Sequence, residues 1–218
     1  MRFDALVFDF DGVLVESVDV KTRAFEQLYA AYGPGVRAKV VAYHLEHGGK
    51  SRYEKFRHFH HAFLGKPLSA AEEASLGQQF SALVEDSVVQ ARWIAGAREF
   101  LEAHHERLSL FVASGTPDVE LKRIIDRRGM TRYFRDARGS PASKADILVG
   151  FVTGHGLNPG RVLMVGDSRT DLAGAQEAGV QFLGVSPAPS DVFPGTVQVV
   201  PDLRRLEEFL SRQTLAQT

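Results

Sequence analysis

The sequence has 218 residues, of which 44% are hydrophobic, and a formal net charge of -1 at pH 7. This length suits one large globular domain or a domain that carries an insertion. The near-neutral charge, without a run of like charges, gives no reason to expect a nucleic acid or an anionic membrane as a partner. The lack of cysteine excludes disulfides, thiolate nucleophiles and cysteine-rich zinc sites, and it suits a cytoplasmic protein.

The first predicted element is a strand over residues 5–10, an apolar run that Asp11 and Gly12 bring to an end. Asp4 and Asp9 also interrupt this region, which the apolar part of a secretory signal would not tolerate. No run in the chain approaches the ~20 apolar residues that a membrane helix needs. We therefore expect neither a signal nor a membrane span.

An all-helical stretch is predicted from about residue 17 to residue 89. Its clearest helical patterns cover residues 21–31, 52–64 and 69–90. In the second of these patterns the phenylalanines follow one another at spacings of three and four residues. We interpret this stripe, Phe56, Phe59 and Phe63, as the core of a helical subdomain.

From Trp93 onward, predicted helices and strands alternate. The helices cover residues 97–105, 117–128, 142–155, 170–178 and 202–212, and the strands cover 108–113, 133–136, 161–165, 180–185 and 197–200. Such alternation predicts an α/β fold, a Rossmann-like doubly wound parallel sheet with helices on both faces. The all-helical stretch then forms an inserted cap domain, with residues 1–15 and 93–218 as the core and 16–92 as the cap.

Polar residues follow the ends of several predicted strands, where ligands bind in open parallel sheets. They are Asp9, Asp11, Ser114, Lys144, Asp167 and Asp171. Asp9 and Asp11 are two residues apart, so both carboxylates can face one space, and their repulsion requires a cation or a proton. A hard cation such as Mg²⁺ suits this set of oxygen ligands, above all with phosphate as a further ligand.

Each of these motifs also has a structural interpretation. Asp11-Gly12 is a common turn pair, and Asp167 and Asp171 would favour the positive end of a helix dipole. The Ser114-Gly115-Thr116 segment leaves backbone amides accessible to an anion, although a helix start alone would explain the junction. Lys144 is either an exposed lysine or a partner of a carboxylate or phosphate.

Together the motifs suit phosphoryl transfer. A magnesium ion and Lys144 would neutralise phosphate oxygens, so that the Asp9 carboxylate can attack phosphorus and form an aspartyl phosphate. Asp11 would give a proton to the leaving alcohol and later take one from water.

Four motifs in this order resemble the haloacid dehalogenase superfamily, in its phosphoglycolate phosphatase and β-phosphoglucomutase branch with a helical cap. They are DFDGVLVES at 9–17, SGT at 114–116, Lys144, and GDSRTD at 166–171. The resemblance implies that Asp9 is the nucleophile, that Asp11 is the general acid and base, and that Ser114 and Lys144 hold the phosphoryl group. It also implies that Asp9, the Asp11 carbonyl and Asp167 bind Mg²⁺, with Asp171 nearby. The founding dehalogenases lack the second aspartate, so Asp11 disfavours carbon–halogen cleavage.

The leaving group is expected to meet the cap. Lys50 and Arg52, in a glycine-containing link between two predicted helices, are candidate substrate-binding residues together with Gly115 and Thr116, unless the two cations are solvated. The cap histidines make a zinc site conceivable, but no carboxylate completes a ligand set, so a surface or partly packed helix face is the better interpretation.

The preferred function is hydrolysis of a small phosphorylated metabolite such as a sugar phosphate or phosphoglycolate. A sugar phosphomutase would share every core residue. Phosphonate cleavage through a Schiff base on Lys50, a phospho-binding regulator without activity, and a signalling receiver domain are further alternatives. The long insertion and the acids on the first strand argue against the receiver. The oligomeric state stays open.

Overall fold

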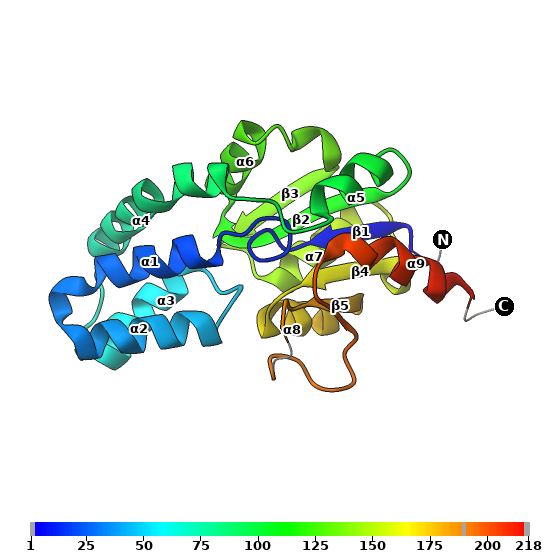
Figure 1. Ribbon diagram of the computed structural model, residues 1–218. Helices are drawn as coiled ribbons and strands as arrows, with labels where there is room; N and C mark the ends of the chain where they lie inside the picture. Colours follow the sequence, from blue (N-terminus) through cyan, green and yellow to red (C-terminus); the bar gives the residue numbers. More distant parts are fainter. Residues whose placement is uncertain (1–2, 189–190, 216–218) are drawn as a thin grey trace.

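The computed structural model describes residues 3–188 and 191–215, and its centre is a six-stranded parallel sheet in the order β3-β2-β1-β4-β5-β6 (Figure 1). The strands are β1 (Ala5–Phe8), β2 (Ser109–Pro117), β3 (Asp136–Ser140), β4 (Val162–Gly166), β5 (Gln181–Val185) and β6 (Val199–Val200). β1 lies between β2 and β4, with Phe8 opposite both Val112 and Val165. The carboxyl end of β1 is therefore the point at which the chain order of the sheet reverses, where α/β proteins form their binding sites.

Helices cover both faces of the sheet because its central strands are apolar on both sides. Leu6 and Phe8 belong to the core beneath α5 (Ala97–His104), α6 (Asp118–Arg127) and α9 (Leu206–Leu215). Ala5 and Val7 belong to the core beneath α7 (Lys144–Gly154) and α8 (Arg169–Glu177). The predicted Rossmann-like α/β fold with an inserted helical cap is confirmed.

The inserted helices lie together on one side of the sheet, at the left of Figure 1. They are α1 (Val18–Leu28), α2 (Pro34–Glu46), α3 (Arg52–His58), which continues into a π-helical turn (Phe59–Phe63), and α4 (Ala70–Gln90). Phe25 is at their centre, with its ring centroid 5.7, 5.6 and 4.4 Å from those of Phe56, Phe59 and Phe80. Phe56 and Phe59 are fully buried, as the stripe predicts.

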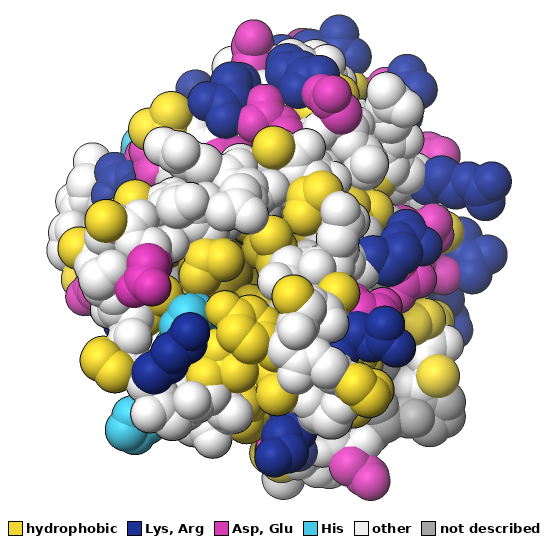
Figure 2. Space-filling view, turned by 90° about the vertical axis from the view of Figure 1, so that its left-hand side faces the viewer, with side chains coloured by type: hydrophobic (Ala, Val, Ile, Leu, Met, Phe, Trp, Pro, Cys, Tyr) yellow, Lys and Arg dark blue, Asp and Glu magenta, His cyan; other side chains and the backbone are white. Residues whose placement is uncertain are grey.

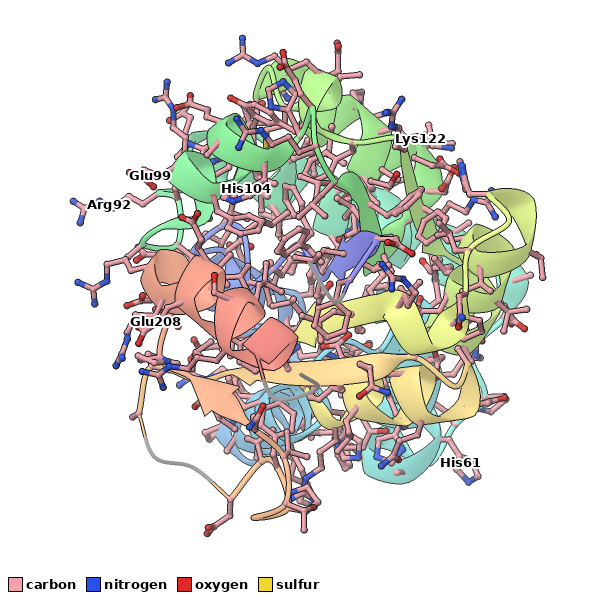
Figure 3. The ribbon with its side chains drawn as sticks, turned by 90° about the vertical axis from the view of Figure 1, so that its right-hand side faces the viewer. His61, Arg92, Glu99, His104, Lys122 and Glu208 are labelled. Carbon is pink, nitrogen blue, oxygen red and sulfur yellow. The ribbon has the colours of Figure 1, made fainter. Side chains whose placement is uncertain are left out.

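The two ends of the molecule present different surfaces. The outer face of the helical segment carries a band of apolar side chains flanked by basic and acidic ones (Figure 2). At the other end of the molecule α9 and the sheet edge face the solvent (Figure 3). The exact limits of core (1–15 and 93–218) and cap (16–92) stay a prediction. No helix in the described part of the chain is long and apolar enough to cross a bilayer.

The strand predicted over residues 133–136 is wrong. Residues Thr131–Tyr133 form a 3-10 turn, and β3 begins only at Asp136. Tyr133 is buried against α5, where its hydroxyl donates to Glu102 at 3.3 Å, so this apolar residue anchors a connection rather than a strand. β3 is an edge strand with polar residues such as Arg138, and a search for apolar runs misses it.

The other differences are smaller. Helix α2 was not among the predicted helices, although Pro34 occupies its first turn, a common position for proline. β2 extends beyond residue 113 to Pro117, so the predicted helix after it begins one residue later than expected, at Asp118. Short 3-10 turns also occur at Ala30–Tyr32, Pro159–Arg161 and Leu203–Arg205.

Candidate active site

Asp9 directly follows β1, and its backbone N–H donates to the carbonyl of Val165 at 2.9 Å, which prolongs the sheet ladder by one residue. Its side chain is 4% exposed. Oδ1 accepts from the N–H of Phe10 at 2.7 Å and lies 2.8 Å from Nζ of Lys144. No described residue donates a hydrogen bond to Oδ2, so one oxygen of Asp9 is held in place while the other remains available.

Lys144 is the first residue of α7, which Ser143 and Asp146 cap reciprocally. Its buried Nζ lies 2.8 Å from Asp9 Oδ1, 2.6 Å from Asp171 Oδ1 and 2.6 Å from the carbonyl of Ala113. Burial alone lowers the pKa of Lys144, but Asp171 and Asp9 outweigh it and hold the pKa above its usual value. The three protons of the ammonium therefore connect the ends of β1 and β2 with α8.

Asp171 has a structural role of its own. Its Oδ2 accepts from the backbone N–H and the hydroxyl of Ser168, at 3.1 and 2.7 Å, and so caps α8. Because its Oδ1 pairs with Lys144, both carboxylate oxygens have partners. Asp171 is thus better suited to hold Lys144 and the start of α8 than to bind a cation directly.

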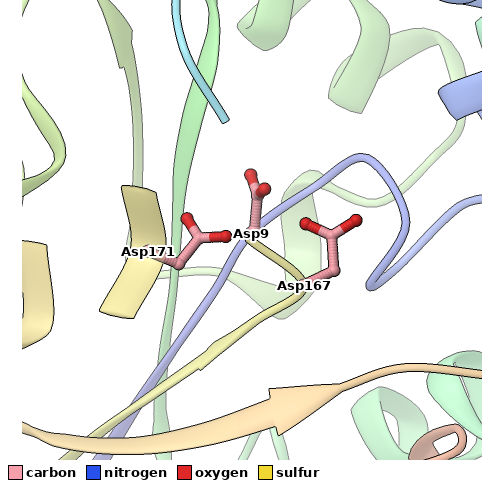
Figure 4. A group of neighbouring side chains, drawn as sticks. All are labelled: Asp9, Asp167 and Asp171. Carbon is pink, nitrogen blue, oxygen red and sulfur yellow. The ribbon is translucent and has the colours of Figure 1, made fainter. Parts of the chain in front are cut away.

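Asp9, Asp167 and Asp171 form an acidic cluster in which one oxygen of each lies within 4.8 Å of the others, with Asp9 between its two neighbours (Figure 4). Burial and the neighbouring Asp171 raise the pKa of Asp9 to about 7, and burial and Asp9 raise that of Asp167 well above its usual value. A divalent cation would relieve this repulsion, and carboxylate oxygens are the ligands that Mg²⁺ prefers. The residues therefore fit a hard divalent metal held mainly by Asp9 and Asp167.

The side chain of Asp11 turns away from this cluster. Its Oδ1 accepts from the hydroxyl of Ser17 at 2.5 Å, and its Oδ2 accepts from Lys21 and, at 3.3 Å, from the hydroxyl of Thr116. Burial raises the pKa of Asp11, but Lys21, Ser17 and Thr116 together bring it below its usual value. Only the backbone of Asp11 would then be open to a metal, as the resemblance implies, while its carboxylate remains able to move a proton.

Gly12 explains why the chain can turn so sharply after Asp11. Its φ is +79°, and a Cβ at this position would lie 2.1 Å from Oδ2 of Asp167. The glycine therefore lets the first strand loop approach the loop after β4 closely enough to bring the acids together.

Of the three residues after Ala113, one supports the cavity wall from behind and two line the cavity. Ser114 is buried, and its Oγ accepts from the N–H of Thr116 at 3.1 Å. Gly115 and Thr116 line the cavity, whereas Ser114, Lys144 and Asp171 lie behind its wall. The residues predicted for the sheet edge thus lie close together, some in the cavity wall and others directly behind it.

A cavity of about 380 Å³ joins this sheet edge to the helical segment. From the core it is lined by Asp9, Asp11, Asp167, Gly115 and Thr116, and from the helical segment by Lys21, Phe25, His44, Lys50, Arg52, Lys55 and Phe80, among others. This volume suits a small ligand.

The two predicted cap cations differ in their surroundings. Arg52 is 4% exposed, and its guanidinium donates to both oxygens of Glu120, at 2.9 and 2.5 Å, and to Ser81 at 2.8 Å. It therefore fastens α3 to α6 of the core. Lys50 is partly buried and lines the cavity.

Three residues near the site were not predicted from the sequence. Lys21 pairs with Asp11, Glu120 pairs with Arg52, and Lys55 lines the cavity. Lys21 is ten residues from its partner and Glu120 is 68 from its own, so no local spacing reveals either contact.

The cap histidines are spread over separate environments. His47 and His58 both stack against the ring of Tyr43, at centroid distances of 3.8 and 3.9 Å. His61 points into the solvent (Figure 3). Within residues 3–188 and 191–215, these histidines join no group with metal-ligand geometry. A packed or exposed helix face is thus the better interpretation of the histidines.

The family model of the haloacid dehalogenase-like hydrolases matches residues 3–179 of this chain. The chain is 26% identical over 199 residues to the phosphoglycolate phosphatase of Photobacterium profundum, which covers 83% of this chain and 82% of that protein. It is 27% identical over 222 residues to Protein CbbY of Rhodobacter capsulatus, which covers 93% and 95%.

The fold resembles that of β-phosphoglucomutase from Clostridium difficile, with a TM-score of 0.81 over 99% of this chain and 98% of the other. The sequence identity to that enzyme is 16%, so this likeness concerns the fold alone.

Proposed function

Because this chain belongs to the haloacid dehalogenase-like hydrolases and is a phosphatase of that family, we propose that it hydrolyses a small phosphomonoester through a covalent aspartyl phosphate on Asp9. The observation that carries this proposal is the asymmetry of the Asp9 carboxylate. Oδ1 is held by Phe10 and Lys144, while Oδ2 receives no hydrogen bond from any described residue. Asp9 lines the cavity, so this second oxygen is available to a ligand there. A nucleophile needs this combination of a fixed position and an available lone pair.

In the first step Oδ2 of Asp9 forms a bond to phosphorus, and the bond between phosphorus and the ester oxygen breaks. Asp11 gives the leaving alcohol its proton. In the second step a water molecule attacks the same phosphorus and Asp11 accepts the proton of that water. The bond between phosphorus and Oδ2 of Asp9 breaks, which frees the carboxylate and releases inorganic phosphate. Mg²⁺, held by Asp9 and Asp167, would neutralise negative charge on the phosphate oxygens.

The surroundings of Asp11 favour the second of its two roles in the resting protein. Ser17, Lys21 and Thr116 stabilise the carboxylate, which is the form that accepts a proton. A bound phosphoryl dianion adds negative charge beside Asp11 and raises its pKa, so Asp11 takes up from the solvent the proton needed for the first step when the substrate binds.

The test is an assay of p-nitrophenyl phosphate with and without Mg²⁺. We expect hydrolysis only with the cation, and a loss of about 10³-fold or more in kcat for Asp9→Asn, because the amide is a poor nucleophile. Asp126→Asn, on the exposed side of α6, is the matched control and should keep full activity. Activity of Asp9→Asn within tenfold of the original protein would refute the covalent route.

The names of the relatives favour phosphoglycolate or a similar small ester as the substrate, and the absence of a cysteine favours a cytoplasmic setting. The fold likeness to β-phosphoglucomutase keeps the mutase as an alternative. Release of inorganic phosphate from the substrate indicates the phosphatase, whereas conversion of one sugar phosphate into its isomer indicates the mutase.

A further inference from the structure

Lys55, on α3, places a buried amino group in the part of the cavity wall that the inserted helices form. The residue is 3% exposed, and it lines the same cavity as Asp9. Nζ lies 2.9 Å from Nδ1 of His44 and 3.5 Å from the carbonyl of His44. It also lies 5.7 Å from the centre of the Phe25 ring.

Two other cations of the cavity wall are paired with acids, whereas Lys50 is only partly buried and Arg169 is exposed to solvent. Lys21 pairs with Asp11, and Arg52 pairs with Glu120. Behind the wall, Lys144 pairs with Asp9 and Asp171. Lys55, in contrast, has no carboxylate oxygen within 4.0 Å in the described part of the chain, although an ammonium removed from water is costly without a counter-charge.

His44 positions this ammonium without neutralising it. Burial, with Lys55 as the next cause, lowers the pKa of His44 to about 3, so the ring is neutral near pH 7. Since Lys55 donates to Nδ1, the ring proton lies on Nε2, which faces away from this contact. Burial, with Lys21 as the next cause, lowers the pKa of Lys55 to about 7 against the opposing effects of Asp11, Asp167 and Glu54, so a bound anion would favour the charged form of Lys55.

We propose that Lys55 binds an anionic group on the leaving alcohol of the substrate, which makes it a specificity-determining residue. The proposal rests on the proposed phosphatase function. The phosphoryl group would lie at the acidic cluster, and a second negative charge on the same small molecule would lie at Lys55. A single ammonium that already donates one hydrogen bond to His44 suits a singly charged carboxylate better than a second phosphate.

The apolar side chains beside Lys55 make this recognition selective. Phe25 and Phe80 line the same region and offer no hydrogen-bonding group to the hydroxyls of a sugar. A short carbon chain between phosphate and carboxylate would contact these rings, whereas several hydroxyls would lose their hydrogen bonds to water. The preferred substrate is therefore a phosphorylated short hydroxy acid rather than a sugar phosphate.

The experiment compares kcat/KM for phosphoglycolate and for ethyl phosphate, two esters of similar size of which only the first carries a carboxylate. We expect the original protein to prefer phosphoglycolate by about 10- to 100-fold. Lys55→Met should abolish this preference and leave the value for ethyl phosphate within about threefold. Lys39→Met, an exposed lysine of the same helical segment, should leave both values unchanged.

Equal losses on both esters in Lys55→Met would overturn the proposal, because a structural role does not distinguish the leaving groups. An original protein that hydrolyses ethyl phosphate as well as phosphoglycolate would also overturn it, while the phosphatase function would stand. If no ester is hydrolysed with Mg²⁺, the phosphatase function itself fails.

A measurement on the original protein covers the case in which Lys55→Met does not fold. Glycolate should inhibit ethyl phosphate hydrolysis competitively, and ethanol at the same concentration should not. Equal effects of glycolate and ethanol would contradict an anion site.

Discussion

Single contacts set the protonation of the side chains that line the cavity. The contact between Lys21 and Asp11 has the most direct effect, because it acts on the pKa of Asp11. Lys21 bridges Asp11 and the hydroxyl of Thr116, which it reaches at 2.8 Å. Among the groups that lower the pKa of Asp11, Lys21 makes the largest contribution. Lys21 therefore keeps Asp11 ready to accept a proton over a wider range of acidic pH.

We expect Lys21→Met to raise the pKa of Asp11, because burial then acts without its strongest compensation. The acidic limb of the kcat profile against pH should move to higher pH, since a protonated Asp11 cannot accept the proton of the attacking water. At alkaline pH the loss should be small. Lys39→Met is the control, and an unshifted acidic limb in Lys21→Met would show that Asp11 is not the base.

Residues that act through distant partners mark the limit of what the sequence could predict. Asp9, Asp11 and Asp167 follow strands, and the geometry of parallel sheets is enough to bring them together. Arg52 lines the cavity, but its guanidinium pairs with Glu120, a residue of α6 with no local signal, and its role in substrate binding stays a prediction. Lys55 was missed because its burial depends on the packing of the inserted helices.

At the scale of elements, a buried ion pair fastens the inserted helices to the core. Arg52 on α3 and Glu120 on α6 are both 4% exposed, and Ser81 on α4 donates to the same carboxylate at 2.5 Å. The Arg52 guanidinium also lies 4.4 Å from the centre of the Phe80 ring. Removal of one partner would leave the other charge buried and unpaired.

Glu120→Gln should lower the free energy of unfolding by about 3 kcal/mol, because it leaves Arg52 without its counter-charge. The double variant Arg52→Met with Glu120→Leu should recover most of this loss, since it removes both charges. Urea unfolding of the single and double variants measures the effect.

The exposed pair Arg57–Glu73 in the same helical segment is the matched control. Glu73→Gln should change the free energy of unfolding by less than about 1 kcal/mol. Equal effects of Glu120→Gln and Glu73→Gln would mean that the buried pair does not hold the two parts together.

Elements with strong periodicity were predicted well, and those that depend on tertiary packing were not. The apolar runs of β1 and β4 and the capping box at the start of α4 are local signals. β3 is short, polar and at the sheet edge, so its register follows from its pairing with β2. Helix α2 has few buried residues, Val40 and His44, and so a weak apolar pattern.

For the whole molecule, the acidic cluster should link stability to the binding of a divalent cation and to pH. Burial and Asp171 raise the pKa of Asp9 from 3.8 to about 7, so between these values the folded protein holds a proton that the unfolded chain releases. The metal-free protein therefore loses stability as the pH rises through this window. A bound cation takes the place of the proton and reverses the loss.

Magnesium should accordingly raise the melting temperature, and more at pH 8 than at pH 5. At a hundred times its Kd the cation would add about 2.7 kcal/mol to the free energy of unfolding. Thermal unfolding with magnesium chloride, against sodium chloride of equal ionic strength, measures this gain, and Asp167→Asn should reduce it. A gain that is equal at both pH values would argue against competition between cation and proton.

The contact between Gly49 and Gly115 has a consequence for the proposed aspartyl phosphate. A Cβ at Gly115 would lie 2.4 Å from the carbonyl oxygen of Gly49, so a hydrogen atom is all that fits between the two backbones. Even one methyl group there would wedge the helical segment away from the sheet edge. The cavity between the two parts would then widen, and more water could reach the proposed aspartyl phosphate than the close contact of the two glycine backbones admits.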